Sequence, residues 1–339
     1  MKELDRVMQK SKKILSLFDL VTIDNKHEME ILPMLPGLGW SGKGTSYRRN
    51  RDVFEKYYIK SQLIGKDFLP SSVCTVFGQE IQAPVFIAPM SGIKSNLRGA
   101  IGEKVFLASI LGGCEQSGMI GMCGDSFDTT DDYIVSSLLR KHKGIAVCKP
   151  RSFNEIKVRI DLLKKTNVVA IGIDLDGLAG LLLSGVKKVF RKDFSELKKI
   201  RALFHGPMFI KGILSIEDAE VVYRSGYNGI VLSNHGGRAI DYSPSPLMIL
   251  PSIVKKYKNK MTILIDGGIS TGYDIFICLA LGADGVLVGR QALYAAVGGG
   301  KEGIVILLEK MVTELKKAML FANCHNIKDI NQTHLERYV

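Results

Sequence analysis

From about residue 84 onwards, short runs of apolar and β-branched residues alternate with longer stretches in which apolar side chains recur at helical spacing. The short runs have the length of buried strands, and they lie at residues 84–88, 119–123, 144–149, 168–174, 208–212, 229–233, 262–266 and 285–288. The longer stretches predict helices at residues 100–117, 130–142, 153–166, 195–204, 215–225, 244–257, 272–281 and 301–321. Strands that are each followed by a helix predict an α/β protein of the (β/α)₈, or TIM-barrel, class.

The first 80 residues lack this alternation. We therefore divide the chain into an N-terminal helical segment with a connector, residues 1–80, and a barrel, residues 81–339. Residues 1–20 place apolar and charged side chains at helical spacing, which predicts an amphipathic helix docked on the domain. The connection from Leu175 to Asp193 carries apolar and basic residues. It predicts a short helix that covers the barrel mouth or contacts a subunit, with a membrane-surface role as the weaker alternative.

A glycine-rich stretch at residues 35–45 contains a literal G-x-G-x-x-G that begins at Gly37, and it nearly matches a phosphate-binding P-loop. Both motifs need a strand before them and a helix after them. Pro33 precedes the stretch, and Gly44 stands where a P-loop has Ser or Thr. We therefore interpret the stretch as a lid or connector that leads into a helix near residues 48–54.

The chain has 46 Lys and Arg residues against 34 Asp and Glu, a formal net charge of +12. A basic surface favours anionic ligands. The basic residues are nevertheless spread along the chain without the interleaved aromatic residues of single-strand binders, so we expect no nucleic-acid partner. No run of about eighteen apolar residues is present, so we expect neither a transmembrane helix nor peripheral membrane contact.

The six cysteines form no C-x-x-C motif, and most of them lie in apolar runs. This pattern is typical of small buried core residues in a reducing compartment. The N-terminal sequence has no signal-peptide core, and we expect a cytoplasmic protein.

Polar residues follow the predicted strands, at the ends that form the active-site face of a (β/α)₈ barrel. After the sixth strand, His235 can accept a proton near neutral pH, and Arg238 can grip a carboxylate with two parallel hydrogen bonds. Gly236 and Gly237 allow a close approach of the backbone to a ligand. The alternative is a tight turn whose His and Arg are merely solvated.

The seventh and eighth strands end in Asp266-Gly267-Gly268-Ile269-Ser270 and Gly289-Arg290. Exposed backbone N–H groups beside an arginine suit a phosphate, although tight turns alone are the alternative. Lys211 ends the fifth strand and can stabilise negative charge on a bound electron acceptor. Its alternative role is an ion pair with Asp174 or Asp266.

Together these motifs, with Leu281-Gly282-Ala283-Asp284, resemble the FMN-dependent 2-hydroxy-acid dehydrogenases and oxidases, the group of glycolate oxidase and lactate oxidase. The resemblance runs from about Ile87 to Ile330. It implies an enzyme built on an FMN-binding barrel, which oxidises a 2-hydroxy acid to a 2-oxo acid by hydride transfer to flavin N5. It also implies a homo-oligomer, a tetramer or octamer, and it leaves the electron acceptor open.

The resemblance also implies roles for individual residues. His235 matches the base, Asp174 the carboxylate that stabilises the protonated histidine, and Arg238 the arginine that holds the substrate carboxylate. Lys211 matches the lysine near flavin N1 and O2. The positions that line the isoalloxazine are Pro89, Met90, Ser91, Gly124, Lys149, Gly172 and Ser233. The positions that match the ribityl-phosphate site are Asp266, Gly267, Gly268, Ser270, Gly289 and Arg290.

The chain departs from the family pattern mainly at the substrate. Trp40 and Arg151 lie near the positions of two active-site tyrosines, and Leu181 lies near that of a second carboxylate-binding arginine. Lys149 replaces a glutamine that faces the flavin, and Ser270 replaces a phosphate-side arginine. We therefore expect a rebuilt substrate wall. Two alternatives stay open: a flavin-dependent isomerase of a phosphorylated substrate and a non-catalytic flavin-binding barrel.

Overall fold

The computed structural model describes residues 2–18, 21–23, 29–31, 38–126, 134–182 and 189–338. Its centre is one eight-stranded sheet in the order β6-β13-β12-β11-β10-β9-β8-β7, in which neighbouring strands pair in parallel. The strands are β6 (Val85–Ile87), β7 (Gly121–Gly124), β8 (Gly144–Cys148), β9 (Val168–Asp174), β10 (Met208–Ile213), β11 (Gly229–Leu232), β12 (Thr262–Ile265) and β13 (Gly285–Val288). The predicted barrel class is confirmed.

Backbone hydrogen bonds on both sides of β6 and β7 bring the two end strands of the sheet together. The Gln82 amide donates to the Gly118 carbonyl at 3.0 Å before the strands, and the Gly124 amide donates to the Met90 carbonyl at 3.4 Å at their other end. These contacts close the sheet into a barrel, so the carboxyl ends of all eight strands face one mouth.

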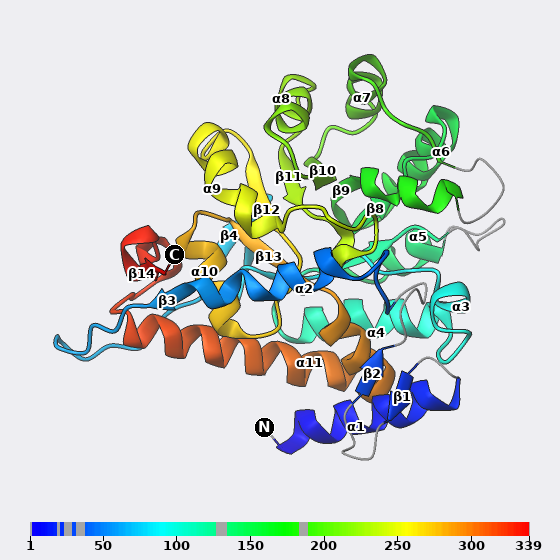
Figure 1. Cartoon of the computed structure of the whole chain (residues 1–339). Helices are drawn as coiled ribbons and strands as arrows, with labels where there is room; N and C mark the ends of the chain where they lie inside the picture. Colours follow the sequence, from blue (N-terminus) through cyan, green and yellow to red (C-terminus); the bar gives the residue numbers. More distant parts are fainter. Residues whose placement is uncertain are drawn as a thin grey trace.

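Helices surround the sheet (Figure 1). They are α4 (Glu103–Gln116), α5 (Ile134–Leu139), α6 (Phe153–Leu163), α7 (Phe194–Arg201), α8 (Ile216–Arg224), α9 (Pro246–Tyr257), α10 (Gly272–Ala280) and α11 (Arg290–Phe321). Gly300 interrupts α11 with a non-helical φ of 57°, so the predicted helix at residues 301–321 is the second part of α11, and a first part that was not predicted begins at Arg290. The chain therefore turns from β13 directly into a helix at the barrel mouth.

Apolar side chains fill the inside of the barrel. The buried cluster there consists of Phe86, Ile120, Met122, Ile145, Val147, Ala170, Phe209, Val231, Leu264 and Leu287, together with Val76 and Ile81. The last two come from the hairpin of β4 (Cys74–Val76) and β5 (Gln79–Ile81), which closes the amino-terminal end of the barrel. Burial of a single large apolar side chain stabilises a fold by about 1.5–3 kcal/mol, so this interior is a packed core and not a channel.

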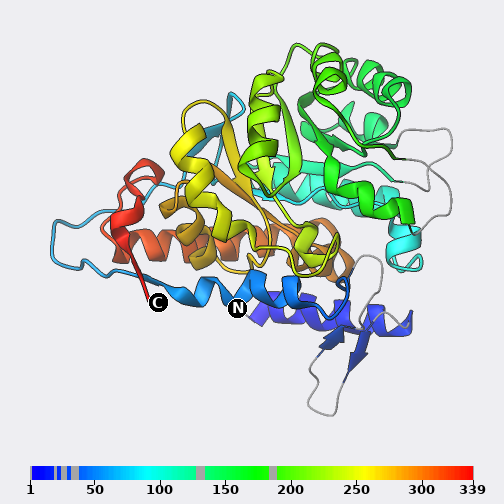
Figure 2. The same ribbon diagram turned by 45° about the horizontal axis from the view of Figure 1, so that its top comes forward.

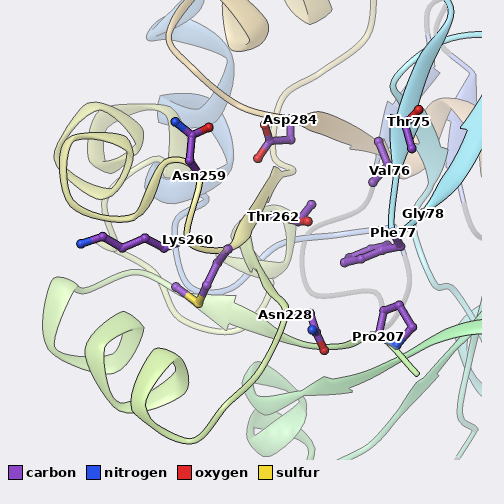
Figure 3. A pocket seen from close by; sticks show the side chains of 11 residues that line it. Thr75, Val76, Phe77, Gly78, Pro207, Asn228, Asn259, Lys260, Thr262 and Asp284 are labelled. Atoms are coloured by element: carbon purple, nitrogen blue, oxygen red, sulfur yellow. The ribbon is translucent and has the colours of Figure 1, made fainter. Parts of the chain in front are cut away.

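A hollow of about 470 Å³ lies beside this hairpin, at the amino-terminal end of the barrel (Figure 3). Thr75, Phe77, Asn228 and Asp284 are among the residues that line it. Asp284 is paired with Lys258 at 2.6 Å. The bottom face of such barrels is the face of stability rather than of chemistry, so we place no active site there.

The first helix of the N-terminal segment packs on the barrel (Figure 2). Helix α1 (Lys2–Leu17) lies against α11, where a Cβ on Gly298 would come within 2.0 Å of the Val7 carbonyl oxygen. Glycine at this position therefore permits the close approach of the two helices, as the prediction of a docked amphipathic helix requires. The division of the chain near residue 80 stays a prediction.

The remaining elements are short. They are β1 (Val21–Ile23), β2 (Met29–Ile31), α2 (Thr45–Asp52), η1 (Phe54–Lys56), β3 (Tyr57–Ile59), α3 (Ile93–Asn96), η2 (Leu175–Leu182), η3 (His235–Gly237), η4 (Ile327–Asp329), η5 (Gln332–His334) and β14 (Leu335–Arg337). Among the described residues, the six cysteines form no disulfide. Within the same part of the chain, every helix is too short or too polar to cross a bilayer.

Candidate active site

A hollow of about 490 Å³ opens at the carboxyl ends of the barrel strands, within the size range of small-molecule sites. Its floor and walls come from the segments that follow β6, β10, β11, β12 and β13, and helix α2 lies over it. The residues that line it include Tyr47, Asn50, Arg51, Pro89, Met90, Lys211, His235, Arg238, Asp266, Gly267, Gly268, Ser270, Gly289 and Arg290. Residues from distant parts of the sequence thus meet at one mouth.

Three carboxylates, two lysines and a histidine form a connected cluster below this hollow. The Lys211 ammonium group donates to Asp174 Oδ1 at 3.0 Å and lies 3.3 Å from Asp176 Oδ2 and 3.8 Å from Asp266 Oδ2. Lys149 Nζ binds the other oxygen of Asp174 at 2.7 Å. The predicted ion pairs of Lys211 with Asp174 and Asp266 are therefore both present.

The histidine joins this cluster through a residue that the sequence analysis did not select. His235 Nδ1 lies 2.9 Å from Asp176 Oδ1, but 3.8 Å from Asp174 Oδ1. Only the shorter of these distances is a hydrogen bond. Asp176 follows the end of β9 by two residues, on the first turn of η2. The sequence itself offered a signal, because a second carboxylate at this spacing was visible beside Asp174.

Burial and the neighbouring charges set the protonation states in the cluster. Burial opposes ionisation of Asp174, but the Lys149 and Lys211 ammonium groups hold the pKa of this carboxyl well below its usual value. Burial lowers the pKa of His235, although the two nearby aspartates partly offset this effect. At neutral pH the imidazole is therefore uncharged, as a proton acceptor has to be.

The backbone of His235 is held in an unusual conformation. Its φ is 56°, in the left-handed region that a non-glycine residue rarely adopts, and such strain costs of order 1–3 kcal/mol. Ser233 Oγ accepts the His235 amide at 3.0 Å, and Asn234 Oδ1 accepts the Gly237 amide at 3.0 Å. These two side-chain bonds hold the turn, so the histidine side chain leaves β11 in a fixed direction.

Helix α2 locks the same turn from the other side. The buried side chains of Asn50 and Asn234 exchange two hydrogen bonds of 2.8 Å each. Asp241 accepts the backbone amides of Lys43 and Ser46, both at 2.8 Å. The connector at residues 38–44 therefore crosses the mouth as a roof, as the interpretation of a lid or connector expects; Gly37 lies outside the described residues.

Two arginines, Arg238 and Arg290, line the hollow. Burial lowers the pKa of Arg238 to about 10, and the neighbouring Arg290 adds to this effect, so Arg238 remains a cation at neutral pH. The Arg290 guanidinium binds the backbone carbonyls of Leu38 and Gly39 at 2.8 and 2.7 Å, and that of Gly236 at 3.1 Å. Arg290 therefore ties the roof to the histidine turn in this structure.

The Asp-Gly-Gly turn after β12 receives a third arginine from α2. Arg51 Nη1 lies 3.3 Å from Ser270 Oγ and 3.3 Å from the Gly268 carbonyl oxygen, and it pairs with Asp274 at 2.7 Å. Gly268 has a φ of 82°, and a Cβ there would come within 2.1 Å of the Asn50 carbonyl oxygen. A cation thus stands beside the turn at which the sequence has Ser270 instead of an arginine.

Asp266 has an unsatisfied oxygen at the floor of the hollow. Its Oδ2 accepts the Ser233 hydroxyl at 2.8 Å, while the buried Oδ1 has no hydrogen-bond partner among the described residues. Burial raises the pKa of Asp266 to about 6. A buried polar atom without a partner in a hollow is a place where a ligand hydroxyl can bind.

Comparison with known proteins identifies the family to which the chain belongs. The family model of the FMN-dependent dehydrogenases matches residues 147–337, more than half of the chain. The chain belongs to the FMN-dependent dehydrogenase family. FMN is therefore its cofactor, as the sequence predicted.

Individual relatives match the chain over a shorter region. A peroxisomal (S)-2-hydroxyacid oxidase of Arabidopsis thaliana is 35% identical over 150 residues, 44% of this chain and 41% of the relative. An L-lactate dehydrogenase of Xanthomonas campestris pv. campestris is 43% identical over 144 residues, 42% of this chain and 37% of the relative. The matched region thus spans about two fifths of the length of these relatives.

The likeness of the fold extends over almost the whole chain. A structure of mandelate oxidase with 3,3-difluoro-2-hydroxy-3-phenylpropionic acid superposes with a TM-score of 0.78 and covers 99% of this chain and 98% of its own. The sequence identity is 22%, so the comparison speaks for the fold alone.

Several of the residues expected to line the isoalloxazine pack against one another at the mouth. A Cβ on Gly124 would come within 2.6 Å of the Pro89 carbonyl oxygen and 2.9 Å of Ser91 Oγ. A Cβ on Gly172 would come within 2.5 Å of the Phe209 ring, so this glycine makes room for a core side chain. Their contact with a flavin stays a prediction.

Arg151 does not face the histidine cluster. It is 4% exposed, and its guanidinium binds Asp125 at 2.8 Å and the Ser126 carbonyl at 2.7 Å. Arg151, which lies near the position of a family tyrosine, therefore forms a buried ion pair with Asp125.

Tyr47 lines the hollow and stacks on Trp40. The Arg290 guanidinium lies over its ring, with 4.6 Å between the ring centre and Cζ. Tyr47 was not among the predicted site residues, because no local sequence pattern links α2 to the barrel mouth.

Proposed function

We propose that the protein oxidises a 2-hydroxy acid to the corresponding 2-oxo acid, with bound FMN as the first electron acceptor. The observation that carries this proposal is the position of His235. One ring nitrogen is bound to a carboxylate, and the residue lines the same hollow as Arg238 and the Asp-Gly-Gly turn. A base and a carboxylate-binding cation beside a flavin site are the groups that this reaction needs.

The residues at the mouth fit the polar parts of FMN. The orphaned Asp266 Oδ1 suits a hydroxyl of the ribityl chain. The N-terminus of α11, with Gly289 and Arg290, suits the phosphate, as does Arg51 beside Ser270. Lys211 supplies a buried cation for the flavin ring, and its neighbouring carboxylates raise its pKa although burial opposes this. When bound, FMN supplies the acceptor for a hydride.

The protein residues would handle the substrate and its proton. Arg238 would hold the substrate carboxylate through its guanidinium fork. Since Nδ1 of His235 is bound to a carboxylate, Nε2 is the nitrogen left to accept the proton of the substrate hydroxyl. The positive charge that then forms on the imidazole would lie beside Asp176 and Asp174.

The experiment is an anaerobic screen of 2-hydroxy acids for bleaching of the bound flavin. At least one acid should bleach it, and the corresponding 2-oxo acid should appear in equal amount. If no 2-hydroxy acid reduces the flavin of a fully loaded protein, the proposed reaction is wrong and a non-catalytic flavin-binding role takes its place.

The His235→Ala variant separates the base from the cofactor site. It should keep its flavin and lose about 10²–10⁴-fold in the rate of flavin reduction, the usual contribution of a positioned base. The matched control is His142→Ala. His142 pairs with Glu115 at 2.9 Å, and neither residue lines the hollow. Equal reduction rates in the His235→Ala variant and the wild type would remove this histidine from the mechanism.

A further inference from the structure

We propose that Asp176, and not Asp174, is the residue that positions His235 for catalysis. This inference rests on the proposed function. The family resemblance assigns the histidine partner to Asp174, the last residue of β9, whereas the geometry points to the carboxylate two residues later. Asp176 is then a positioning residue, because it would act through the imidazole and not on the substrate.

The distances divide the two carboxylates between different partners. Asp176 Oδ1 lies 2.9 Å from His235 Nδ1, and its contacts with the Lys211 ammonium group are longer, at 3.3 and 3.4 Å. Asp174 lies 3.8 Å from the same imidazole nitrogen. The short, charge-assisted bond to the ring therefore belongs to Asp176.

Asp174 is already committed to two lysines. Its Oδ2 accepts Lys149 Nζ at 2.7 Å, and its Oδ1 accepts Lys211 Nζ at 3.0 Å. Lys149 stands where the family resemblance implies a neutral glutamine, so the chain has gained a cation at this point. A carboxylate bound by two ammonium groups is a weaker acceptor for a third donor, which leaves Asp176 to bind the histidine.

The backbone of β10 makes the room that Asp176 needs. The pairing register of β10 with β11 shifts between Lys211 and Ile213, and Gly212 in between has a φ of 97°. A Cβ on Gly212 would come within 2.8 Å of the Asp176 backbone nitrogen and 2.9 Å of the Asp176 Cβ. The irregularity in β10 thus lets the first turn of η2 approach the histidine.

This arrangement fixes the tautomer of the imidazole. With Nδ1–H donating to Asp176, Nε2 carries a lone pair and can accept the hydroxyl proton of the substrate. After that transfer both ring nitrogens carry protons, and the Asp176 carboxylate stabilises the imidazolium. Without a carboxylate at position 176, the ring loses both the preferred tautomer and the counter-charge.

The test compares Asp176→Asn with Asp174→Asn in the FMN-loaded protein. Asp176→Asn should slow flavin reduction by at least about 10²-fold. It should also move the acidic limb of the pH–rate profile to lower pH, because the imidazolium loses its counter-charge. Asp174→Asn should slow reduction less, since the bond between Asp176 and His235 persists. Asp176→Glu should recover part of the rate, and the surface variant Asp161→Asn should match the wild type.

A second measurement needs no substrate, so it distinguishes failure of this inference from failure of the proposed function. The ¹⁵N resonances of the histidine rings are measured in the oxidised, FMN-loaded protein. The resonances of His235 are those that disappear in the His235→Ala variant, and they report the tautomer and the pKa of this ring. Asp176→Asn should lower this pKa more than Asp174→Asn does. If Asp174→Asn lowers the pKa or the reduction rate as much as Asp176→Asn or more, Asp174 is the partner and our assignment is wrong.

Discussion

Asn50 and Asn234 exchange two side-chain hydrogen bonds of 2.8 Å across 184 positions of sequence. Both side chains are 1% exposed, and together they join α2 to the turn that carries His235. The Asn234 amide also binds Ser243 Oγ and the Pro244 carbonyl. The pair is thus the centre of a polar network inside the roof of the mouth.

Replacement of Asn50 by alanine should destabilise the protein by about 1–3 kcal/mol, because Asn234 loses two buried hydrogen bonds. The midpoint of urea unfolding measures this, with Asn154→Ala on the exposed face of α6 as the control. The variant should also bind flavin less tightly, since the roof is looser. An unchanged midpoint would show that the two amides contribute nothing net to the docking of α2.

Arg51 should recognise the phosphate of FMN. The Arg51→Gln variant should lose about 10- to 100-fold in FMN affinity, the worth of a hydrogen bond to a charged group, while riboflavin affinity stays nearly the same. Fluorescence titration of the flavin-free protein with both flavins measures the ratio, and Lys56→Gln controls for the loss of one positive charge. Equal weakening of both flavins would mean that Arg51 supports the fold and not the phosphate.

Asp266 should give the flavin-free protein a distinctive pH dependence. Its folded-state pKa is raised from 3.8 to about 6 by burial, so between these values the folded state binds a proton that the unfolded state does not. The stability that this group contributes is full below pH 3.8 and is lost as the pH rises to about 6. This amounts to about 3 kcal/mol.

Asp266→Asn removes this titration. The free energy of unfolding of the variant, relative to the wild type, should therefore increase between pH 4 and pH 6 and be constant above. Denaturant unfolding at a series of pH values measures the difference. A difference that does not vary with pH would mean that Asp266 is ionised throughout, in spite of its burial.

Substrate choice should follow the rebuilt wall. Arg151 is bound to Asp125 and therefore does not replace the arginine implied near Leu181. Loss of one charge-assisted bond would weaken a two- or three-carbon acid by about 10- to 100-fold. We therefore expect glycolate and L-lactate to be poor substrates and a bulkier 2-hydroxy acid to be better. Values of kcat/KM across acids of increasing side-chain size, with an artificial acceptor, test this.

Arg238→Lys completes that test, because lysine keeps the charge but loses the two-pronged geometry. On the best acid, the variant should lower kcat/KM by at least about 10-fold, the lower value for the loss of one charge-assisted hydrogen bond. Little change would show that another group holds the carboxylate, and efficient oxidation of glycolate or lactate by the wild type would contradict the expected wall.

The eight barrel strands could be predicted to within about two residues because each is a short buried run bounded by polar or glycine residues, as at Gly285–Val288. The short strands β1–β5 and β14 were not predicted, and β1–β5 fall mostly in the segment that was predicted to be helical. The positions of His235, Arg238 and Asp266 at one mouth followed from the barrel class itself. Arg51 and Tyr47 could not be placed, since α2 reaches the mouth through contacts between distant segments that leave no local periodicity. The choice between Asp174 and Asp176 depended on a register shift in β10, which no pattern of hydrophobic residues reports.

The roof over the mouth has a consequence for the synthesis of the protein. The ribosome makes α2 before any barrel strand, yet its partners Asn234, Gly268 and Ser270 follow β11 and β12, near the end of the chain. The nascent α2 therefore has no place to dock until most of the polypeptide has emerged. The chain can therefore bind its cofactor only after translation of the barrel is nearly complete.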